Sequence, residues 1–456
     1  MKKLNSINPT NLEIIDQVPI SSKKEISSYV ALAQHASPMW RKLGLKKRVV
    51  ILQKVIDEFR KRKEEIATLE TREMGMPITQ SRLDMDDAVR YFQWYVDNAE
   101  KYLSSEIVFE DKQSIHTVFY EPVGVAAVIT PWNFPISNVV WGAGQNLVAG
   151  NTVVFKHSEE CPLTAQLIES VINSHLPKGV FNQIYGTGSE GDFLVHQAVD
   201  LICFTGSTKV GTYLYRQAAK KFVKAILEMG GSAPGVIFAD ADIDHILESI
   251  YFNRFLNSGQ MCDALKRLLV HESIYEETVT KLKHLLQTKK LGDPANEITD
   301  IGPLVTQRQV ILLEAQVKDA ITKGAKIEIG GKRPVHLHGA FFEPTLLTNV
   351  TSNMRVWKEE VFGPVLPILS FKTDTEAILL ANDTSYGLGA YIYTQNEQKA
   401  QLIAKQLKSG MVSINGVSYL QPTDPFGGYK FSGKGREHGK FGFADVTQIK
   451  VVAKKK

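Results

Sequence analysis

The sequence predicts an α/β protein with two domains, each built around a mainly parallel sheet. Short apolar segments alternate with helix-length segments from about residue 123 onward, and this alternation is typical of parallel sheets covered by helices. The chain of 456 residues also exceeds what one hydrophobic core usually serves. A second alternating region runs from about 234 to 393, so we expect the domain boundary near residues 230–234.

The individual elements follow from the spacing of apolar residues. Apolar residues recur at helical intervals in 49–56 and its flanks, which predicts mostly helices over 23–102. A hairpin is expected next, because 107–109 and the alternating segment 114–121 flank a polar turn. The strands expected in the first sheet are 123–129, 152–155, 180–184 and 200–204, and those expected in the second include 235–238 and 268–270.

Composition and charge exclude several classes of protein. The formal net charge is only +4, and the excess lysines lie at the two ends, in 1–3 and 454–456, where we expect frayed, solvated tails. A nucleic-acid-binding protein gathers its basic residues on one face, so no nucleic-acid partner is predicted. The sequence has no signal-peptide pattern and no run of 18 or more apolar residues, so no membrane association is predicted. Three cysteines are too few for a disulfide framework and favour a reducing, cytoplasmic environment.

One cysteine stands in a segment that suits covalent catalysis. Cys262 ends the run 257–262, in which Gly259 permits close approach of backbone, and Glu228 lies a short distance before it. Only the thiolate is nucleophilic, and a free thiol has a pKa of roughly 8.5, so a reactive cysteine needs a nearby base. On these residues alone a buried structural thiol remains an alternative. Cys161 and Cys203 are expected to be structural.

Two glycine-rich segments suggest nucleotide binding. Residues 186–191 match the G-x-G-x-x-G pattern after a strand, but the acidic residue expected about 20 positions later is absent. Residues 206–211 open a helix after a strand, without the Lys-Ser/Thr pair of a phosphate-binding ATPase loop. A helix N-terminus with small residues suits a diphosphate, and a simple tight turn is the alternative. His336 and His338 have the spacing of a metal pair but no neighbouring Cys or Asp, so no metal site is predicted.

Six motifs in a fixed order resemble the aldehyde dehydrogenase superfamily. They are TPWNFP at 130–135, FTGS at 204–207, EMGGS at 228–232, GQMC at 259–262, EVFGP at 360–364 and PFGG at 425–428. The resemblance extends from residue 8 to about 450 and is nearest to the short branch that includes NAD(P)-dependent succinate-semialdehyde dehydrogenases. It implies an aldehyde dehydrogenase-like fold, in which a Rossmann-like cofactor domain, a catalytic domain and a small β oligomerisation element form a homodimer or homotetramer. The implied boundaries are 1–103 and 123–233 for the cofactor domain, 234–430 for the catalytic domain, 104–122 and 446–456 for the oligomerisation element, and 431–445 returning to the cofactor domain.

The resemblance implies oxidation of an aldehyde to a carboxylic acid. Cys262 would attack the carbonyl to form a thiohemiacetal, and Asn133 would hold the oxyanion together with the backbone N–H of Cys262. Glu228 would then activate the water that hydrolyses the thioester. Two alternatives stay open, a coenzyme A-acylating or phosphorylating relative and a non-catalytic structural member. Retention of Glu228 favours hydrolysis over acyl transfer, and the three residues together favour catalysis.

The resemblance also assigns positions that bind NAD(P). Lys156 and Glu159 match the positions at the adenosine ribose, and a carboxylate at Glu159 would repel a 2′-phosphate, which favours NAD over NADP. The segment 186–191 falls near the adenine and is expected to matter less. The remaining cofactor positions are Trp132, Gly206, Ser207, Met229, Glu360 and Phe362.

Two residues bear on the identity of the aldehyde. Relatives that oxidise succinate semialdehyde often have an arginine eight residues after the oxyanion asparagine, where this chain has Trp141. Asp263 follows the nucleophile, and both residues disfavour an anionic substrate unless another arginine, such as Arg254, compensates. We therefore expect an uncharged aliphatic or aromatic aldehyde, with succinate semialdehyde as the alternative. Trp141 as an aromatic residue of the core remains a second interpretation.

Overall fold

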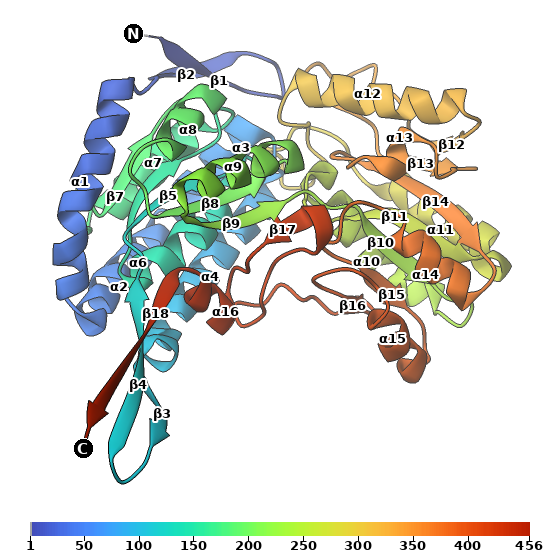
Figure 1. Cartoon of the computed structure of the whole chain (residues 1–456). Helices are drawn as coiled ribbons and strands as arrows, with labels where there is room; N and C mark the ends of the chain where they lie inside the picture. Colours follow the sequence, from blue (N-terminus) through green and yellow to red (C-terminus); the bar gives the residue numbers. More distant parts are fainter. Residues whose placement is uncertain (1) are drawn as a thin grey trace.

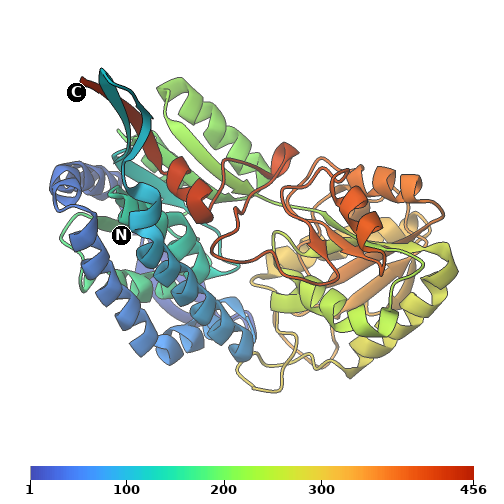
Figure 2. The same ribbon diagram turned by 90° about the horizontal axis from the view of Figure 1, so that it is seen from below.

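The computed structural model describes residues 2–456, which form two α/β lobes and a projecting three-stranded sheet (Figure 1). The two lobes lie side by side in the second view, with the C-terminal segment returning to the N-terminal lobe (Figure 2). The predicted α/β class is confirmed, because both large sheets are mainly parallel and helices pack against them. Within the described residues no helix is both long enough and apolar enough to cross a membrane.

The first lobe is built on a six-stranded sheet in the order β17-β9-β8-β5-β6-β7, in which only β17 runs antiparallel. Its strands are β5 (Val125–Ile129), β6 (Thr152–Lys156), β7 (Phe181–Ile184), β8 (Leu201–Gly206), β9 (Lys224–Met229) and β17 (Gly433–Lys434). Its helices are α1 (Lys23–Lys42), α2 (Leu45–Lys61), α3 (Lys63–Met74), α4 (Ile78–Leu103), α5 (Pro135–Val139), α6 (Gln145–Ala149), α7 (Pro162–Asn173), α8 (Gly188–Val195), α9 (Thr208–Lys221) and α16 (Gly439–Asp445), with a π-helical turn η1 (Val140–Gly144). Alternate residues of the fully buried strand β5 enter two different cores, Ala126 and Val128 one, Val125 and Ala127 the other. Helices therefore cover both faces of this sheet.

The second lobe repeats this plan with a seven-stranded sheet in the order β12-β13-β14-β11-β10-β15-β16. Only the edge strand β12 is antiparallel to its neighbour. The strands are β10 (Ala233–Ile237), β11 (Leu265–His271), β12 (Lys326–Ile329), β13 (Thr345–Thr348), β14 (Val365–Phe371), β15 (Tyr391–Tyr393) and β16 (Ser413–Ile414). The helices are α10 (Ile243–Phe255), α11 (Tyr275–Thr288), α12 (Gln307–Thr322), α13 (Arg355–Lys358), α14 (Asp374–Asn382) and α15 (Glu397–Ala404), with short turns η2 (Leu256–Gly259), η3 (Glu272–Ile274) and η4 (Lys430–Ser432). The chain crosses from β9 to β10, and so from one sheet to the other, through residues 230–232.

A three-stranded antiparallel sheet projects from the first lobe (Figure 1). It consists of β3 (Glu106–Glu110), β4 (Ser114–Pro122) and the C-terminal strand β18 (Thr447–Lys455).

A separate hairpin, β1 (Lys3–Ile7) with β2 (Ile14–Pro19), lies at the start of the chain. The expectation of frayed tails is wrong at both ends, because Lys3 pairs with Pro19 and Lys454 pairs with Ile115. Backbone pairing orders these segments even though their lysine side chains stay exposed.

The predicted strands agree with the structure to within three residues at each end. The sequence patterns missed β1, β2 and the π-helical turn η1, none of which carries a long apolar run.

The order of strands in the six-stranded sheet also has a functional consequence. The chain runs from β5 outward to β6 and β7, then returns to place β8 on the other side of β5. The carboxyl ends of β5 and β8 therefore flank a topological switch point, where open α/β sheets bind ligands.

Candidate active site

A cavity of about 780 Å³ lies beside the carboxyl ends of the strands of the six-stranded sheet. It is lined by residues of both lobes. One side comes from the segments at the carboxyl ends of β5, β8 and β9, and another comes from α4, η1 and a C-terminal loop. We call Trp132, Asn133, Gly206, Ser207, Glu228 and Met229 the strand-end wall. We call Asp84, Asp87, Arg90, Trp141 and Phe426 the helix wall. Cys262, Asp263, Glu360 and Phe362 are among the residues that the second lobe adds to the lining.

Cys262 follows a backbone turn of unusual conformation. Asn257 and Ser258 have φ angles of 50° and 54°, and Gly259 follows at 76°. Left-handed backbone at a residue other than glycine costs roughly 1–3 kcal/mol, so surrounding contacts must hold this turn. A Cβ atom at Gly259 would lie 2.5 Å from the carbonyl oxygen of Gly363, which explains the glycine at this position. The turn brings Cys262 to the cavity.

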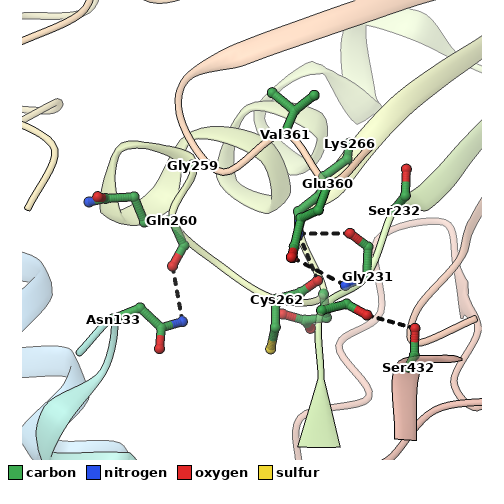
Figure 3. A network of polar contacts seen from close by, with 12 residues as sticks. Asn133, Gly231, Ser232, Gly259, Gln260, Cys262, Lys266, Glu360, Val361 and Ser432 are labelled. Atoms are coloured by element: carbon green, nitrogen blue, oxygen red, sulfur yellow. Dashed lines mark hydrogen bonds and ion pairs between the residues drawn. The ribbon is translucent and has the colours of Figure 1, made fainter. Parts of the chain in front are cut away.

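Asn133 ties the first lobe to this turn. Its side chain is 5% exposed, and Nδ2 donates to the carbonyl of Gln260 at 3.0 Å (Figure 3). Its own carbonyl accepts from Nδ2 of Asn257 at 2.6 Å. The amide predicted to hold an oxyanion therefore lies on the cavity wall, next to the segment that carries Cys262.

The thiol of Cys262 is half-buried and faces the cavity. Burial raises the pKa of Cys262 well above its ordinary value, the negative charge of Asp263 raises it further, and the ammonium of Lys266 opposes the increase. Cys262 is therefore a protonated thiol at neutral pH in this structure. Its use as a nucleophile requires a base that removes the proton.

Glu228 is the carboxyl group of the strand-end wall. It is 2% exposed, and neither of its oxygens has a hydrogen-bond partner among residues 2–456. Burial raises its pKa well above the ordinary value, and the nearby Glu437 adds to the increase. A Cβ atom at Gly427 would lie 2.7 Å from Oε1 of Glu228, so glycine there leaves room for the carboxyl. A carboxylate with a raised pKa is a stronger base than an ordinary one.

The rest of the strand-end wall suits a bound diphosphate. Gly206 ends β8, and Ser207 caps helix α9 by accepting from the backbone N–H of Val210 at 3.4 Å. The positive end of this 14-residue helix therefore points to the cavity at the switch point. Gly211 leaves space for the side chain of Met229, which also lines the cavity. Residues 206–211 thus form the helix N-terminus that the glycine pattern predicted.

Glu360 reaches the cavity from the second lobe. Its carboxylate accepts from the backbone N–H of Gly231 at 3.1 Å and forms an ion pair with Lys266 (Figure 3). A side chain at Gly230 would collide with this carboxylate, so Glu360 depends on glycine in the segment that joins the two sheets. Phe362 lies nearby and meets the ring of Trp132 edge to face, with centroids 5.5 Å apart.

Lys156 and Glu159 lie at the carboxyl end of β6 but do not line the cavity itself. Nζ of Lys156 is 3.3 Å from the Glu159 carboxylate, and Lys156 is almost fully buried. Burial lowers the pKa of Lys156, and Glu159 opposes this change. The segment 186–191 follows β7 and includes the start of α8, where Thr187 and Glu190 form a reciprocal cap. That cap accounts for the local pattern without a ligand.

Trp141 is both an aromatic residue of the core and a residue of the cavity wall, which are the two interpretations that the sequence left open. The ring packs against Tyr91 and Phe426, each with centroids 5.2 Å away, and against His438 at 4.4 Å. It also lines the cavity, and its Nε1 has no partner among the described residues. The π-helical turn η1 carries Trp141 to this position.

Asp263 is 4% exposed and accepts a hydrogen bond from Tyr419 at 3.2 Å. The hydroxyl of Tyr391 lies 2.9 Å from that of Tyr419 and donates to the backbone carbonyl of Asp263 at 3.0 Å. Burial raises the pKa of Asp263. This residue therefore presents a hydrogen-bonded carboxyl to the cavity, directly after the cysteine.

The suggestion that Arg254 compensates for the missing arginine is wrong. Arg254 is fully buried and outside the cavity lining. Its guanidinium donates to the carbonyl of Val365 at 2.7 Å and to those of Gly363, Val361 and Gly259. These carbonyls consume its donors, so the charge stabilises the backbone around the Cys262 turn and does not meet a substrate.

Sequence patterns missed three features that line the cavity or lie directly behind its lining. They are the buried Lys266, the α4 residues Asp84, Asp87 and Arg90, and Glu437. Lys266 had a detectable signal, because it and Arg267 are charged residues among the buried apolar residues of strand β11. The helical segment 78–103 gave no such signal. Among the described residues no group of three or more His, Cys, Asp and Glu is arranged to hold a metal ion, and His336 and His338 are in no such group.

The fold and the cavity define an enzyme in which a cysteine, an amide and a carboxyl group from two lobes face one space beside a nucleotide-type helix N-terminus. The pattern of the aldehyde dehydrogenase family matches residues 1–452, and the chain belongs to this family. The resemblance to this superfamily, including its short semialdehyde-oxidising branch, is confirmed. The protein is therefore an oxidoreductase that acts on aldehydes.

Several relatives cover nearly the whole chain. Glutarate-semialdehyde dehydrogenase of Pseudomonas aeruginosa is 36% identical over 97% of this chain and 92% of its own length. Succinate-semialdehyde dehydrogenase [NADP(+)] GabD of Escherichia coli is also 36% identical, with the same coverage of both chains. The crystal structure of betaine aldehyde dehydrogenase from Staphylococcus aureus in complex with NAD⁺ has a TM-score of 0.96 at 34% identity, over 99% of this chain and 91% of that one. The cofactors in these names agree with the predicted NAD(P).

Proposed function

We propose that this protein oxidises an uncharged aldehyde to a carboxylic acid with NAD(P)⁺ through a covalent intermediate on Cys262. The observation that carries the proposal is that Cys262, Asn133 and Glu228 all line one cavity, although they come from three segments of two lobes. A structural thiol would not require an unpartnered carboxyl and a buried amide on the same cavity surface.

The first step forms a bond between Sγ of Cys262 and the carbonyl carbon of the aldehyde. Glu228 in its ionised form accepts the thiol proton, directly or through one water, because burial makes this carboxylate a strong base. The carbonyl oxygen becomes an oxyanion that accepts from Nδ2 of Asn133 and from the backbone N–H of Cys262. One such donor contributes about 3–4 kcal/mol to transition-state stabilisation.

The second half of the reaction releases the acid. When bound, the nicotinamide supplies a hydride acceptor for the tetrahedral carbon, which leaves a thioester on Cys262. Glu228 first releases the thiol proton to solvent and becomes ionised again. It then takes a proton from water, the resulting hydroxide attacks the thioester carbonyl, and the thiolate of Cys262 leaves. The two roles follow one another and both need a base of raised pKa, so one carboxyl group can serve both.

The cavity fits a dinucleotide in several respects. Ser207 at the N-terminus of α9 would receive the diphosphate, and Glu360 would accept ribose hydroxyls at the nicotinamide end. Phe362, Trp132 and the backbone of Met229 would flank the ring and its ribose. Lys156 and Glu159 would bind the adenosine ribose, and Glu159 favours NAD because its carboxylate repels a 2′-phosphate. A measured preference for NAD⁺ over NADP⁺ would support this assignment.

The helix wall supports an uncharged substrate. Trp141 and Phe426 offer aromatic surface, and Arg254 is unavailable to a substrate carboxylate. One observation favours a semialdehyde instead, because Arg90 also lines the cavity. Its guanidinium is already bonded to Asp87 at 2.9 Å and to the carbonyl of Leu420 at 3.3 Å, which leaves it poorly placed for a second anion.

A panel of aldehydes tests the proposal. NADH formation is followed by absorbance with hexanal, benzaldehyde and succinate semialdehyde, with and without coenzyme A or phosphate, for the wild type and Cys262→Ala. We expect turnover without either acceptor, kcat/KM at least as high for hexanal as for the semialdehyde, and no turnover by Cys262→Ala. Activity in Cys262→Ala, or none on any aldehyde, would refute the covalent mechanism. A strong preference for succinate semialdehyde would refute the substrate class alone.

The division of the chain and its assembly are part of the same proposal. The segments 1–103, 123–233 and 431–445 would form the cofactor domain, and 234–430 the catalytic domain. The projecting sheet of β3, β4 and β18 exposes Ile107, Phe109 and Val451, and pairing with another copy would cover them. We expect a homodimer or homotetramer in the cytoplasm, and a monomer in light scattering would contradict this assembly.

A further inference from the structure

Lys266 is a buried cation at the point where the two lobes and the cysteine segment meet. Its side chain is fully buried, on strand β11, four residues after Cys262. Nζ donates to the carbonyl of Gly231 at 2.9 Å, to the carbonyl of Cys262 at 3.0 Å and to the carboxylate of Glu360 (Figure 3). Each acceptor belongs to a different segment of the chain.

This arrangement fixes the ammonium group in one place. A lysine has three N–H donors and no acceptor, and here three acceptors use all three. Nζ also lies 5.1 Å from the ring centroid of Phe362. Burying a charge is costly unless it is paired and hydrogen-bonded, and both conditions are met. A purely apolar strand residue would fill the same space without this cost, so the charge itself requires an explanation.

The three acceptors belong to residues with a place in the proposed reaction, and on Cys262 the acceptor is the backbone carbonyl of the residue that carries the thiol. Glu360 is the proposed ligand of the nicotinamide ribose, Cys262 is the proposed nucleophile, and Gly231 lies in the segment that joins the two sheets. A collision with any side chain at Gly230 shows how closely Glu360 lies over that segment. Lys266 links Glu360 to the same segment, because Nζ donates both to that carboxylate and to the carbonyl of Gly231.

We propose that Lys266 is a positioning residue that fixes Glu360 for the cofactor ribose and keeps a positive charge beside the Cys262 thiol. This inference rests on the proposed function and adds a residue to it. Loss of the charge would affect both partners at once: Glu360 would lose its ion pair, and the cysteine would lose its neighbouring cation. The two partners lie in different parts of the sequence, so Lys266 couples the cofactor site to the nucleophile.

The charges around the thiol support the second effect. Asp263, Glu360 and Glu228 each raise the pKa of Cys262, whereas Lys266 lowers it. Burial lowers the pKa of Lys266 itself and the nearby Arg254 adds to this, but Glu360 opposes both. The ion pair with Glu360 therefore also helps to keep the lysine charged.

The test uses the full chain with Lys266→Met and Lys266→Gln, and Lys430→Met as the matched control. Lys430 also donates to two backbone carbonyls, those of Asn382 and Thr384, but lies outside the cavity lining. The rate of Cys262 alkylation by iodoacetamide is measured from pH 6 to pH 10 without cofactor. We expect both Lys266 variants to react at least threefold more slowly than wild type at pH 7.5, with the profile moved to higher pH. Lys430→Met should follow the wild-type profile.

Titration with NAD⁺, followed by calorimetry, gives the second readout. We expect Kd to rise at least tenfold in Lys266→Met and in Glu360→Gln, and the double variant to be weakened by less than the product of the two single effects. Melting temperatures identify a variant that fails to fold. If Lys266→Met fails to fold, Lys266→Gln, which keeps an N–H donor but no charge, still gives the alkylation profile.

A folded Lys266 variant with the wild-type alkylation profile and wild-type Kd for NAD⁺ would overturn the inference. This outcome differs from failure of the proposed function, because alkylation and NAD⁺ binding are both measured without turnover. The covalent mechanism fails if Cys262→Ala remains active or if the wild type oxidises no aldehyde, and neither result depends on Lys266.

Discussion

The strand-end wall and the helix wall of the cavity are built in different ways. Residues of the strand-end wall lie where parallel strands end, so the topology of the sheet determines their positions. The helix wall instead combines side chains from α4, from η1 and from a loop more than 300 residues after α4 in the sequence. Its shape depends on packing between elements that no single sequence motif spans. The difference separates the chemistry, which follows from the fold, from the choice of aldehyde, which follows from side-chain packing.

A substitution in the strand-end wall should give the largest effect. In Glu228→Gln we expect steady-state turnover to fall about 10²–10⁴-fold, because an amide cannot serve as a general base. If the loss falls mainly on thioester hydrolysis, rapid mixing will show a burst of about one NADH per site before the slow phase. Wild-type turnover in Glu228→Gln would show that Glu228 is not a catalytic base. It would also contradict the view that the strand-end wall carries the chemistry.

The substitution Asp263→Asn should have a smaller effect, and we expect it to speed up alkylation of Cys262. Because the carboxylate of Asp263 raises the pKa of Cys262, Asp263→Asn lowers that pKa and moves alkylation by iodoacetamide to lower pH. We expect alkylation at pH 7.5 to become several-fold faster, while KM for hexanal changes by less than about tenfold. Tyr419→Phe serves as the control, since it removes the hydrogen bond to Asp263 and keeps the carboxyl. Slower alkylation in Asp263→Asn would mean that the carboxyl helps to ionise the thiol.

The same difference explains what the sequence could predict. A strand such as Val125–Ile129 is a continuous buried apolar run, and its position was predictable to within two residues. Cys262, Asn133 and Glu228 each stand in a local motif, and the structure places all three on one cavity. Arg254 was assigned wrongly because its guanidinium binds backbone carbonyls around the Cys262 turn. The left-handed conformation of that turn cannot be predicted from the residue pattern.

Lys266 escaped prediction for a related reason. Its carboxylate partner Glu360 lies 94 positions away in the sequence, and only the packing of β11 against the segment after α13 brings the two together. Pairs of this kind depend on tertiary structure, as does the whole helix wall. Local patterns therefore predicted the site where one segment supplies the residue and failed where the contact between segments decides its role.

Substitution of Glu70, which lies behind the helix wall, should have the smallest effect on catalysis. This residue of α3 is fully buried, and neither carboxyl oxygen has a partner among the described residues. Burial raises its pKa well above the ordinary value, and the neighbouring Asp84 of the helix wall adds to the increase. The folded protein therefore holds a proton on Glu70 that the unfolded chain releases above a pKa of about 4.3. The resulting stabilisation is complete below that pH and is lost as pH rises towards the pKa in the folded state.

Glu70→Gln carries no ionisable group and avoids this loss. We expect the variant to be more stable than wild type by about 1–3 kcal/mol at pH 8, with a difference that shrinks towards pH 4, as measured by urea unfolding at each pH. Turnover of hexanal should change by less than twofold, because the residue supports the helix wall from behind and does not line the cavity. A stability difference that stays constant with pH would mean that Glu70 is not protonated on folding. A large loss of turnover would mean that the helix wall carries part of the chemistry, against the distinction drawn between the walls.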